Sequence, residues 1–207
     1  MNQFHSSYLE KAVEELSKLP GIGEKTALRL ILHLLKQDET FALSLSEALK
    51  EVRTKTRRCS ICHNLSDSDI CPVCADAARN RRQICIVEDI GSLMSIESTG
   101  KYKGLYHVLE GKLSPMENMG PEKLTIESLI ARIDLEKPEE IIFALGTTLE
   151  AEVTTIYLYD LLKPYGNIKF STIARGISFG NDIEDADTLT LGKSIELRTE
   201  FEPQTSE

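Results

Sequence analysis

The sequence lacks the long apolar runs and the leader pattern that would direct a chain into a membrane or out of the cell. No apolar stretch approaches the roughly 20 residues that a membrane-spanning helix needs. The chain starts Met-Asn-Gln-Phe-His-Ser-Ser, without a basic segment followed by an apolar core. Internal repeats and low-complexity segments are also absent. We therefore expect a cytoplasmic protein that contacts no membrane and whose thiols stay reduced.

An overall positive charge, which would favour nucleic acid as a partner, is absent too. The net charge is −9, but it is unevenly distributed. Residues 1–82 carry 13 basic and 11 acidic side chains, whereas residues 83–207 carry 11 and 22. Contacts with DNA are therefore expected in the first part, and the acidic second part suits proteins or a metal ion. The alternative is that both parts simply expose solvated charges.

Hydrophobic periodicity predicts several modules in this chain of 207 residues. Three segments near the N-terminus have helical spacing (8–18, 24–35 and 40–57), and Thr40 is the expected cap of the third. After the cysteines, apolar runs of strand type alternate with helical segments, which is typical of a mainly parallel sheet covered by helices. The expected strands lie at 83–87, 105–109, 140–145 and 168–173. Residues 187–197 are expected to form a last short helix or an extended arm.

The predicted fold class is α/β and multi-module. It combines a helical N-terminal module, a four-cysteine knuckle, a mainly parallel α/β domain and a short C-terminal arm. The predicted boundaries are 1–56, 57–80, 81–173 and 174–207.

Two glycines interrupt the helical pattern in Leu19-Pro-Gly-Ile-Gly23. Gly21 and Gly23 permit a tight turn with positive φ angles. The first amides of the next helix then point outward and can hold a phosphate, and Lys25 and Arg29 extend that contact from one helical face. Such binding reads no bases, so it should be independent of sequence and weakened by salt. The string is similar to the helix-hairpin-helix DNA-binding motif, and the alternative is a plain connection between two helices.

Four of the five cysteines form two Cys-x2-Cys pairs separated by eight residues, and they are Cys59, Cys62, Cys71 and Cys74. Two such pairs complete a tetrahedral all-thiolate site without a position for water, so we predict one structural Zn²⁺ per chain. Disulfides are a weak alternative in a reducing compartment. His63 could compete as a ligand but is expected to be a surface histidine. Cys85 alternates with apolar neighbours and is expected to be buried.

Three glutamates follow predicted strands at the carboxyl ends, where ligands bind in open α/β sheets. Glu88 ends the first strand, and Glu150 and Glu152 follow the third. Together they could hold Mg²⁺ for phosphoryl chemistry, or they could be solvated residues of an acidic domain. Metal catalysis is the less favoured interpretation, because no Asp-x-Asp pair follows the third strand and no nucleophile is evident.

In this order, the motifs resemble the RecR family of bacterial recombination mediators over nearly the whole chain. The matching segments are Leu19–Arg29, Cys59–Cys74, Ile84–Glu88 opening a topoisomerase/primase-type (Toprim) domain, Gly111–Pro115, Thr148–Glu152, and Ala174–Ile177 leading into Thr188–Leu191.

The resemblance implies a non-catalytic, nucleoid-associated scaffold for DNA repair and recombination. Such proteins assemble as rings, usually tetramers, that encircle or clamp DNA. They act with RecO, and often RecF, to load RecA at single-stranded gaps. Lys25 and Arg29 match DNA-facing positions of the family, and Glu88, Glu150 and Glu152 match acidic Toprim positions linked to partner binding. The stretch 175–198 resembles the segment that contributes to ring assembly.

The sequence departs from the family pattern at four places. Gly146-Thr147 stands where Asn-Pro is usual, and Ala151 replaces the glycine between the two acidic residues. Ser178 and Glu24 each stand where proline is common. The first two changes bear on the loop near the acidic pair. Glu24 suits the positive end of the helix dipole but weakens the local field for DNA.

Three functions from different classes follow. The favoured one is a DNA-binding loading scaffold. The second is a Mg²⁺-dependent Toprim nuclease, primase or strand transferase, which needs the three glutamates to bind metal. The third is a protein-only adaptor, in which the hairpin and the cysteines are purely structural. Loss of DNA binding in a Lys25→Ala/Arg29→Ala protein would separate the first from the third.

Overall fold

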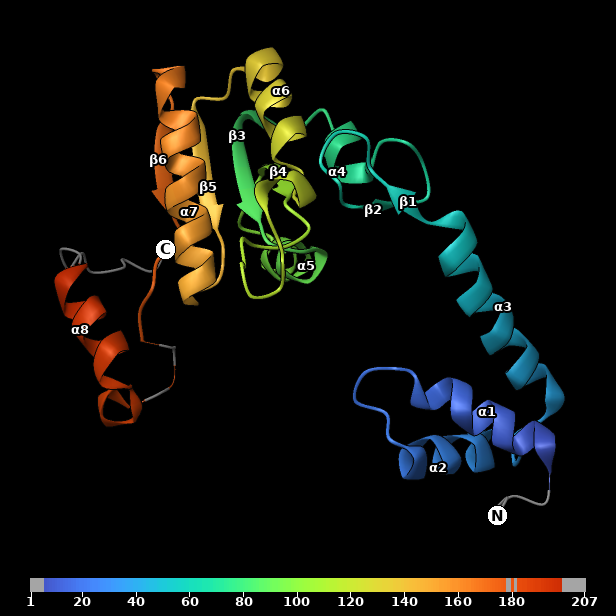
Figure 1. Cartoon of the computed structure of the whole chain (residues 1–207). Coiled ribbons are helices and arrows are strands. Elements are labelled where there is room, and N and C mark those ends of the chain that lie inside the picture. Colours follow the sequence, from blue (N-terminus) through green and yellow to red (C-terminus); the bar gives the residue numbers. More distant parts are fainter. Residues whose placement is uncertain (1–5, 178–179, 181, 199–207) are drawn as a thin grey trace, which may run out of the picture. The chain divides into compact units, whose positions relative to one another are not determined.

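A computed structural model describes residues 6–177, 180 and 182–198 of the chain (Figure 1). The chain divides into two compact units, Met1–Thr56 and Arg57–Glu207. The predicted division into four modules is finer than this and stays a prediction. Ser178 and the C-terminal tail from residue 199 lie outside the described residues. None of the helices in the described part has both the length and the apolar composition that a membrane crossing requires.

The first unit consists of three helices, α1 (Ser7–Ser17), α2 (Glu24–Leu34) and α3 (Glu39–Lys55). All three agree with the predicted segments, but Thr40 as the cap of α3 is wrong. Asp38 caps this helix by accepting hydrogen bonds from the Phe41 amide (3.3 Å) and from the Thr40 hydroxyl (2.7 Å). Asp38, two residues before Thr40, is the better cap because its carboxylate accepts both hydrogen bonds at once.

The second unit begins with the cysteine module. It contains a short antiparallel pair, β1 (Arg57–Arg58) and β2 (Leu65–Ser66), followed by the single-turn helix α4 (Pro72–Ala75). Its buried interior consists of the four paired cysteines, with Ile61 and Val73 packed against them. So small an apolar interior cannot hold a fold by itself, which is the usual reason for a metal in such modules.

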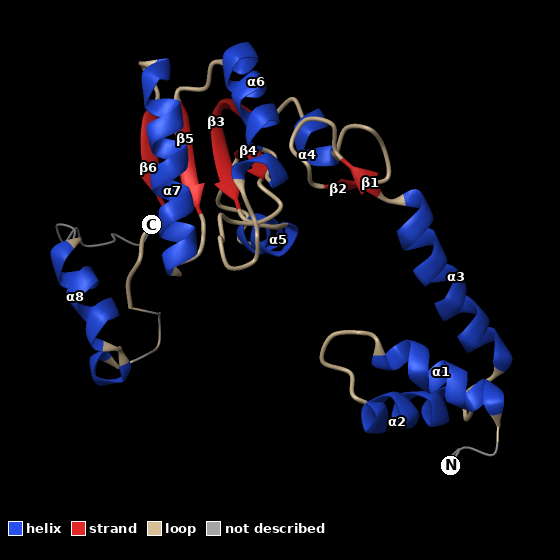
Figure 2. Ribbon diagram, in the orientation of Figure 1, coloured by secondary structure: helices blue, strands red, loops and turns tan. Residues whose placement is uncertain are grey.

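A four-stranded parallel sheet forms the centre of the second unit, with strand order β4-β3-β5-β6 (Figure 2). Its elements are β3 (Asn80–Val87), α5 (Ile90–Ser98), β4 (Gly104–Val108), α6 (Ile126–Glu136), β5 (Glu140–Ala144), α7 (Leu149–Leu162) and β6 (Lys169–Thr172). Val87 pairs with Val108 and with Ala144, so three strands end at the same level. The predicted parallel α/β domain is therefore confirmed.

Helices cover both faces of this sheet, as alternation of strands and helices requires. Helices α6 and α7 lie on one face (Figure 2), where their apolar residues pack on Ile84, Ile86 and Phe143. Helix α5 contributes Leu93 to the opposite face, which also buries Cys85 as expected. Because alternate residues of β3 enter both cores, this strand reads as a continuous apolar run.

The remaining elements are three 3₁₀ turns (Pro121–Lys123, Lys163–Tyr165 and Ile183–Asp185) and helix α8 (Thr188–Glu196). Asp187 caps α8 by accepting from the Thr190 amide at 2.9 Å. The last segment is therefore a helix, the first of the two forms expected from its sequence.

Candidate metal centre and nucleic-acid interface

The four paired cysteines converge on one point. Their sulfur atoms all lie within 4.8 Å of one another, and all four side chains are buried. The Cys71 amide donates to the sulfur of Cys59 (3.3 Å), and the Cys74 amide donates to the sulfur of Cys71 (3.5 Å). Amides directed at sulfur stabilise thiolates, and four thiolates in this arrangement suit one tetrahedral zinc ion.

His63 is not the surface histidine that its sequence position suggests. It adopts a left-handed backbone conformation (φ 63°), and its Nε2 lies 2.7 Å from the hydroxyl of Ser128 on α6. Its ring stands edge-on to His107, with 5.3 Å between the ring centres. Burial lowers the pKa of His63 below its ordinary value. The side chain thus joins the cysteine module to the parallel α/β domain instead of binding the metal.

The turn between α1 and α2 has only one of the two positive φ angles that the glycines suggest. Gly21 has φ +77° and follows Pro20 in a turn closed by the Ile22 amide, which donates to the Leu19 carbonyl at 3.1 Å. Gly23 instead has φ −81° and ψ 166°, the extended conformation of a helix cap, and no side chain there satisfies the first amides of α2. Those amides are available to an anion.

Basic side chains line one open groove along α2. Lys25 and Arg29 share it, as predicted, and both are exposed. His33 and Lys36 continue the same groove, which has a volume of about 390 Å³. Sequence reasoning missed these two, although His33 lies four residues after Arg29 on the same helical face, and Lys36 follows just beyond the end of α2. Glu24 is exposed at the first turn of the helix.

The three glutamates lie where the sequence predicts, at the carboxyl edge of the sheet, but each has its own partner. Glu88 pairs with Lys112, with 3.4 Å between Oε1 and Nζ. Glu152 pairs with Arg175 at 2.9 Å. Hydrogen bonds from its own amide and from Thr148 lower the pKa of Glu150. Within the described ranges, the four cysteines are the only group of three or more potential ligands that gathers closely enough for an ion.

Two of the departures from the family pattern lie beside these glutamates. Ala151 is fully buried in α7, where its methyl group joins the core. Gly146 lies against Glu88, since a Cβ atom built on it would be 3.6 Å from Oε2. Thr148 caps α7 by accepting from the Ala151 amide at 3.3 Å.

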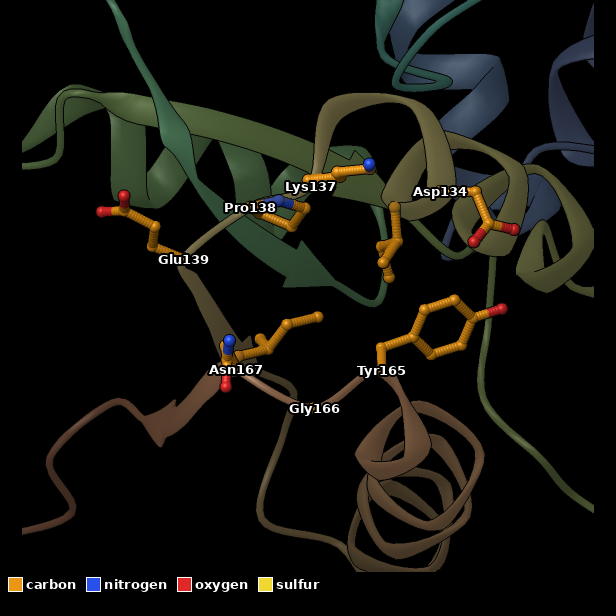
Figure 3. A pocket seen from close by; sticks show the side chains of 9 residues that line it. Asp134, Lys137, Pro138, Glu139, Tyr165, Gly166 and Asn167 are labelled. Atoms are coloured by element: carbon orange, nitrogen blue, oxygen red, sulfur yellow. The ribbon is translucent and has the colours of Figure 1, made fainter.

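A separate hollow opens at the amino ends of β5 and β6 (Figure 3). Its volume is about 390 Å³, and the lining includes Asp134, Lys137, Glu139, Tyr165 and Asn167. It lies at the opposite end of the strands from Glu88. The lining combines acidic and basic side chains with an amide and a phenol. Because this mixture matches no single kind of ligand, we assign no ligand to the hollow.

Comparison with known proteins matches three family models in chain order. They describe a RecR helix-hairpin-helix (residues 9–53), a RecR zinc finger domain of the four-cysteine type (56–76) and a Toprim domain (82–174). "Recombination protein RecR" of Flavobacterium johnsoniae is 51% identical over 200 residues, covering 97% of each chain. The protein of that name from Bacteroides thetaiotaomicron is 47% identical over 199 residues, covering 96% of this chain and 97% of its own.

The chain belongs to the RecR family. The family's zinc finger model and the convergence of the four cysteines confirm the predicted zinc site, with one ion per chain. The match to the RecR hairpin model supports DNA binding, and family membership supports a role in recombination.

Proposed function

We propose that the chain is a non-catalytic, nucleoid-associated scaffold of recombinational repair, which clamps DNA as a ring, most simply a tetramer built from dimers. In this proposal it acts with RecO and RecF to load RecA at single-stranded gaps. The observation that carries the proposal is the basic groove of α2 beside the uncapped amides that follow Gly23. Backbone amides and basic side chains on one surface bind phosphates without reading bases.

The apolar surface of the first unit supports self-association. Val13 and Ala27 are the only buried apolar residues in its described part. Helix α3 has no buried residue along its 17 positions. An apolar stripe runs along α3, formed by four residues spaced three or four positions apart. These residues are Phe41 (48% exposed), Leu45 (42%), Leu49 (61%) and Val52 (67%). A stripe of this size on a small helical unit is typical of a surface that another protein chain covers.

The ion pairs at the carboxyl edge of the sheet support partner binding over catalysis. Glu88 and Glu152 are each occupied by a basic side chain of the same chain, whereas metal-dependent phosphoryl transfer needs several carboxylates free to hold one ion. Basic side chains of a partner such as RecO can exchange with Lys112 and Arg175 at these carboxylates.

DNA affinity at several salt concentrations tests the proposal. Lys25→Ala/Arg29→Ala should weaken binding to gapped DNA and lower the slope of log affinity against log salt by about 2, one for each phosphate contact. Lys50→Ala/Arg53→Ala removes the same charge from α3 of the same unit and is the matched control. Equal effects of the two double variants would contradict the assignment of the groove.

A denaturing gel tests the absence of catalysis. Zinc-loaded protein with end-labelled gapped DNA, nucleotides and Mg²⁺ or Mn²⁺ should give no cleaved, extended or covalently attached product. A metal-dependent product that disappears in Glu88→Gln would identify the chain as a Toprim enzyme instead.

A further inference from the structure

Lys112 is fixed at the acidic edge by backbone hydrogen bonds on both sides of it. The Gly111 amide donates to the carbonyl oxygen of Glu88 at 2.9 Å. The Leu113 amide donates to the hydroxyl of Thr154 on α7, also at 2.9 Å. The segment therefore runs from the end of β3 to α7 and carries the Lys112 backbone across the carboxyl edge. Its side chain starts from a fixed point, unlike that of an ordinary surface lysine.

The ammonium group of Lys112 lies among the oxygen atoms of this edge. It is 3.4 Å from Oε1 of Glu88 and 3.4 Å from the hydroxyl of Thr148, the cap of α7. The two charged side chains are only 26% and 22% exposed, for Lys112 and Glu88 respectively. Partial burial reduces screening of their attraction by salt. The lysine's charge also helps to lower the pKa of Glu150, after hydrogen bonds from its own amide and Thr148.

A divalent cation does not fit these residues as they stand. Mg²⁺ requires oxygen ligands at about 2.0–2.1 Å in octahedral geometry, and at Glu88 it would meet the positive charge of Lys112. A further carboxylate, Glu152, is turned to Arg175 at 2.9 Å. Like charges at such short range repel strongly in a partly buried site.

We propose that Lys112 is a built-in counter-ion, which takes the place of a divalent cation beside Glu88. The acidic edge then needs no Mg²⁺ to balance the charge of this carboxylate. The lysine neutralises Glu88 and keeps the Gly111–Leu113 segment and the cap of α7 together. This role requires neither DNA nor a partner protein.

Binding of Mn²⁺ to the zinc-loaded full chain tests the proposal, with free Mn²⁺ measured by electron paramagnetic resonance. Lys112→Met keeps the length of the side chain and removes its charge. We expect this variant to bind one Mn²⁺ at least about tenfold more tightly than the unchanged protein, a factor that corresponds to about 1.4 kcal/mol. Lys101→Met, which removes an exposed lysine elsewhere in the unit, should bind as the unchanged protein does.

A second substitution, at Glu88, tests whether the added Mn²⁺ binds at this carboxylate. Lys112→Met/Glu88→Gln should lose the added affinity, because the carboxylate that the lysine neutralises is gone. Equal affinity of the unchanged protein and Lys112→Met, whether tight or weak, would overturn the proposal. So would tight binding by the double variant. Lys112→Gln gives a second neutral substitution if the methionine variant does not fold. The Mn²⁺ measurement does not depend on DNA binding, so it stays valid even if the groove of α2 proves not to bind DNA.

Discussion

The backbone amide of Val108 donates a 2.9 Å hydrogen bond to the carbonyl oxygen of Cys62, which joins a zinc ligand to the edge strand β4. Two side-chain contacts reinforce this connection. Arg58 pairs with Glu110 at 2.7 Å, and His63 contacts Ser128. The zinc module and the parallel sheet are therefore connected by direct contacts, so loss of the metal should lower the stability of the sheet.

Loss of zinc should loosen the sheet from the β4 side. Structural zinc contributes about 10–16 kcal/mol of apparent binding free energy in zinc-finger peptides. If about a quarter of this reaches the sheet, Cys71→Ser should lower the Tm of the second unit by roughly 5–15 °C. Hydrogen exchange should accelerate more at Val108 in β4 than at Phe170 in β6. Equal acceleration in both strands would argue against transmission through the Cys62–Val108 contact.

The two glycines of the hairpin should respond oppositely to substitution. Gly21→Ala places a side chain at φ +77°, which costs about 1–2 kcal/mol, so the first unit should lose stability. Gly23→Ser has room, since no atom lies within 4 Å of an added Cβ atom. Serine there can cap α2 and should stabilise it by a few tenths of a kcal/mol.

DNA binding distinguishes these variants further. In Gly23→Ser the hydroxyl competes with phosphate for the first amides of α2, so DNA affinity should fall although stability does not. Chemical denaturation and a DNA titration on the same samples check both effects. If Gly23→Ser bound DNA as tightly as the unchanged protein, the amides would not form part of the interface.

Local pattern was sufficient to predict the fold class, the strands and the cysteine cluster, because spacing and turn chemistry act over a few residues. Contacts between distant segments could not be predicted in this way. His63 is half-buried, and α6 brings Ser128 into contact with it from 65 residues along the chain. The partners of Glu88 and Glu152 come from Lys112 and Arg175, 24 and 23 residues away, and no periodicity connects them.

His107 should make the stability of the second unit depend on pH. Burial, and then the charge of Arg132, lower the pKa of His107 from 6.5 to about 3. The unfolded chain therefore binds a proton that the folded chain does not between about pH 6.5 and 3. Stability should fall as the pH falls through this range, by up to about 1.4 kcal/mol per pH unit from this group.

A comparison with His107→Gln isolates this contribution from that of the zinc ligands, which are protonated in acid in both proteins. The glutamine amide can still donate to the Thr125 carbonyl, which His107 Nε2 contacts at 3.1 Å. Between pH 6.5 and 5, the unchanged protein should lose more unfolding free energy in urea than the variant does. Parallel curves for the two proteins would mean that His107 is protonated in the folded state.

The apolar stripe of α3 should control self-association. Leu49→Lys/Val52→Lys places two charges in it, and desolvating them in an interface is unfavourable. We therefore expect a smaller assembly by sedimentation equilibrium at a given concentration. Ser46→Lys/Thr54→Lys adds the same charge to α3 outside the stripe and should leave the assembly unchanged. If both double variants reduced the assembly equally, general repulsion between acidic or basic surfaces would explain the effect, and the stripe would have another role. If only the stripe variant reduced the assembly, the stripe would be the surface of self-association. A loss of DNA affinity by that variant at low protein concentration would further indicate that copies of the chain must associate in order to clamp DNA.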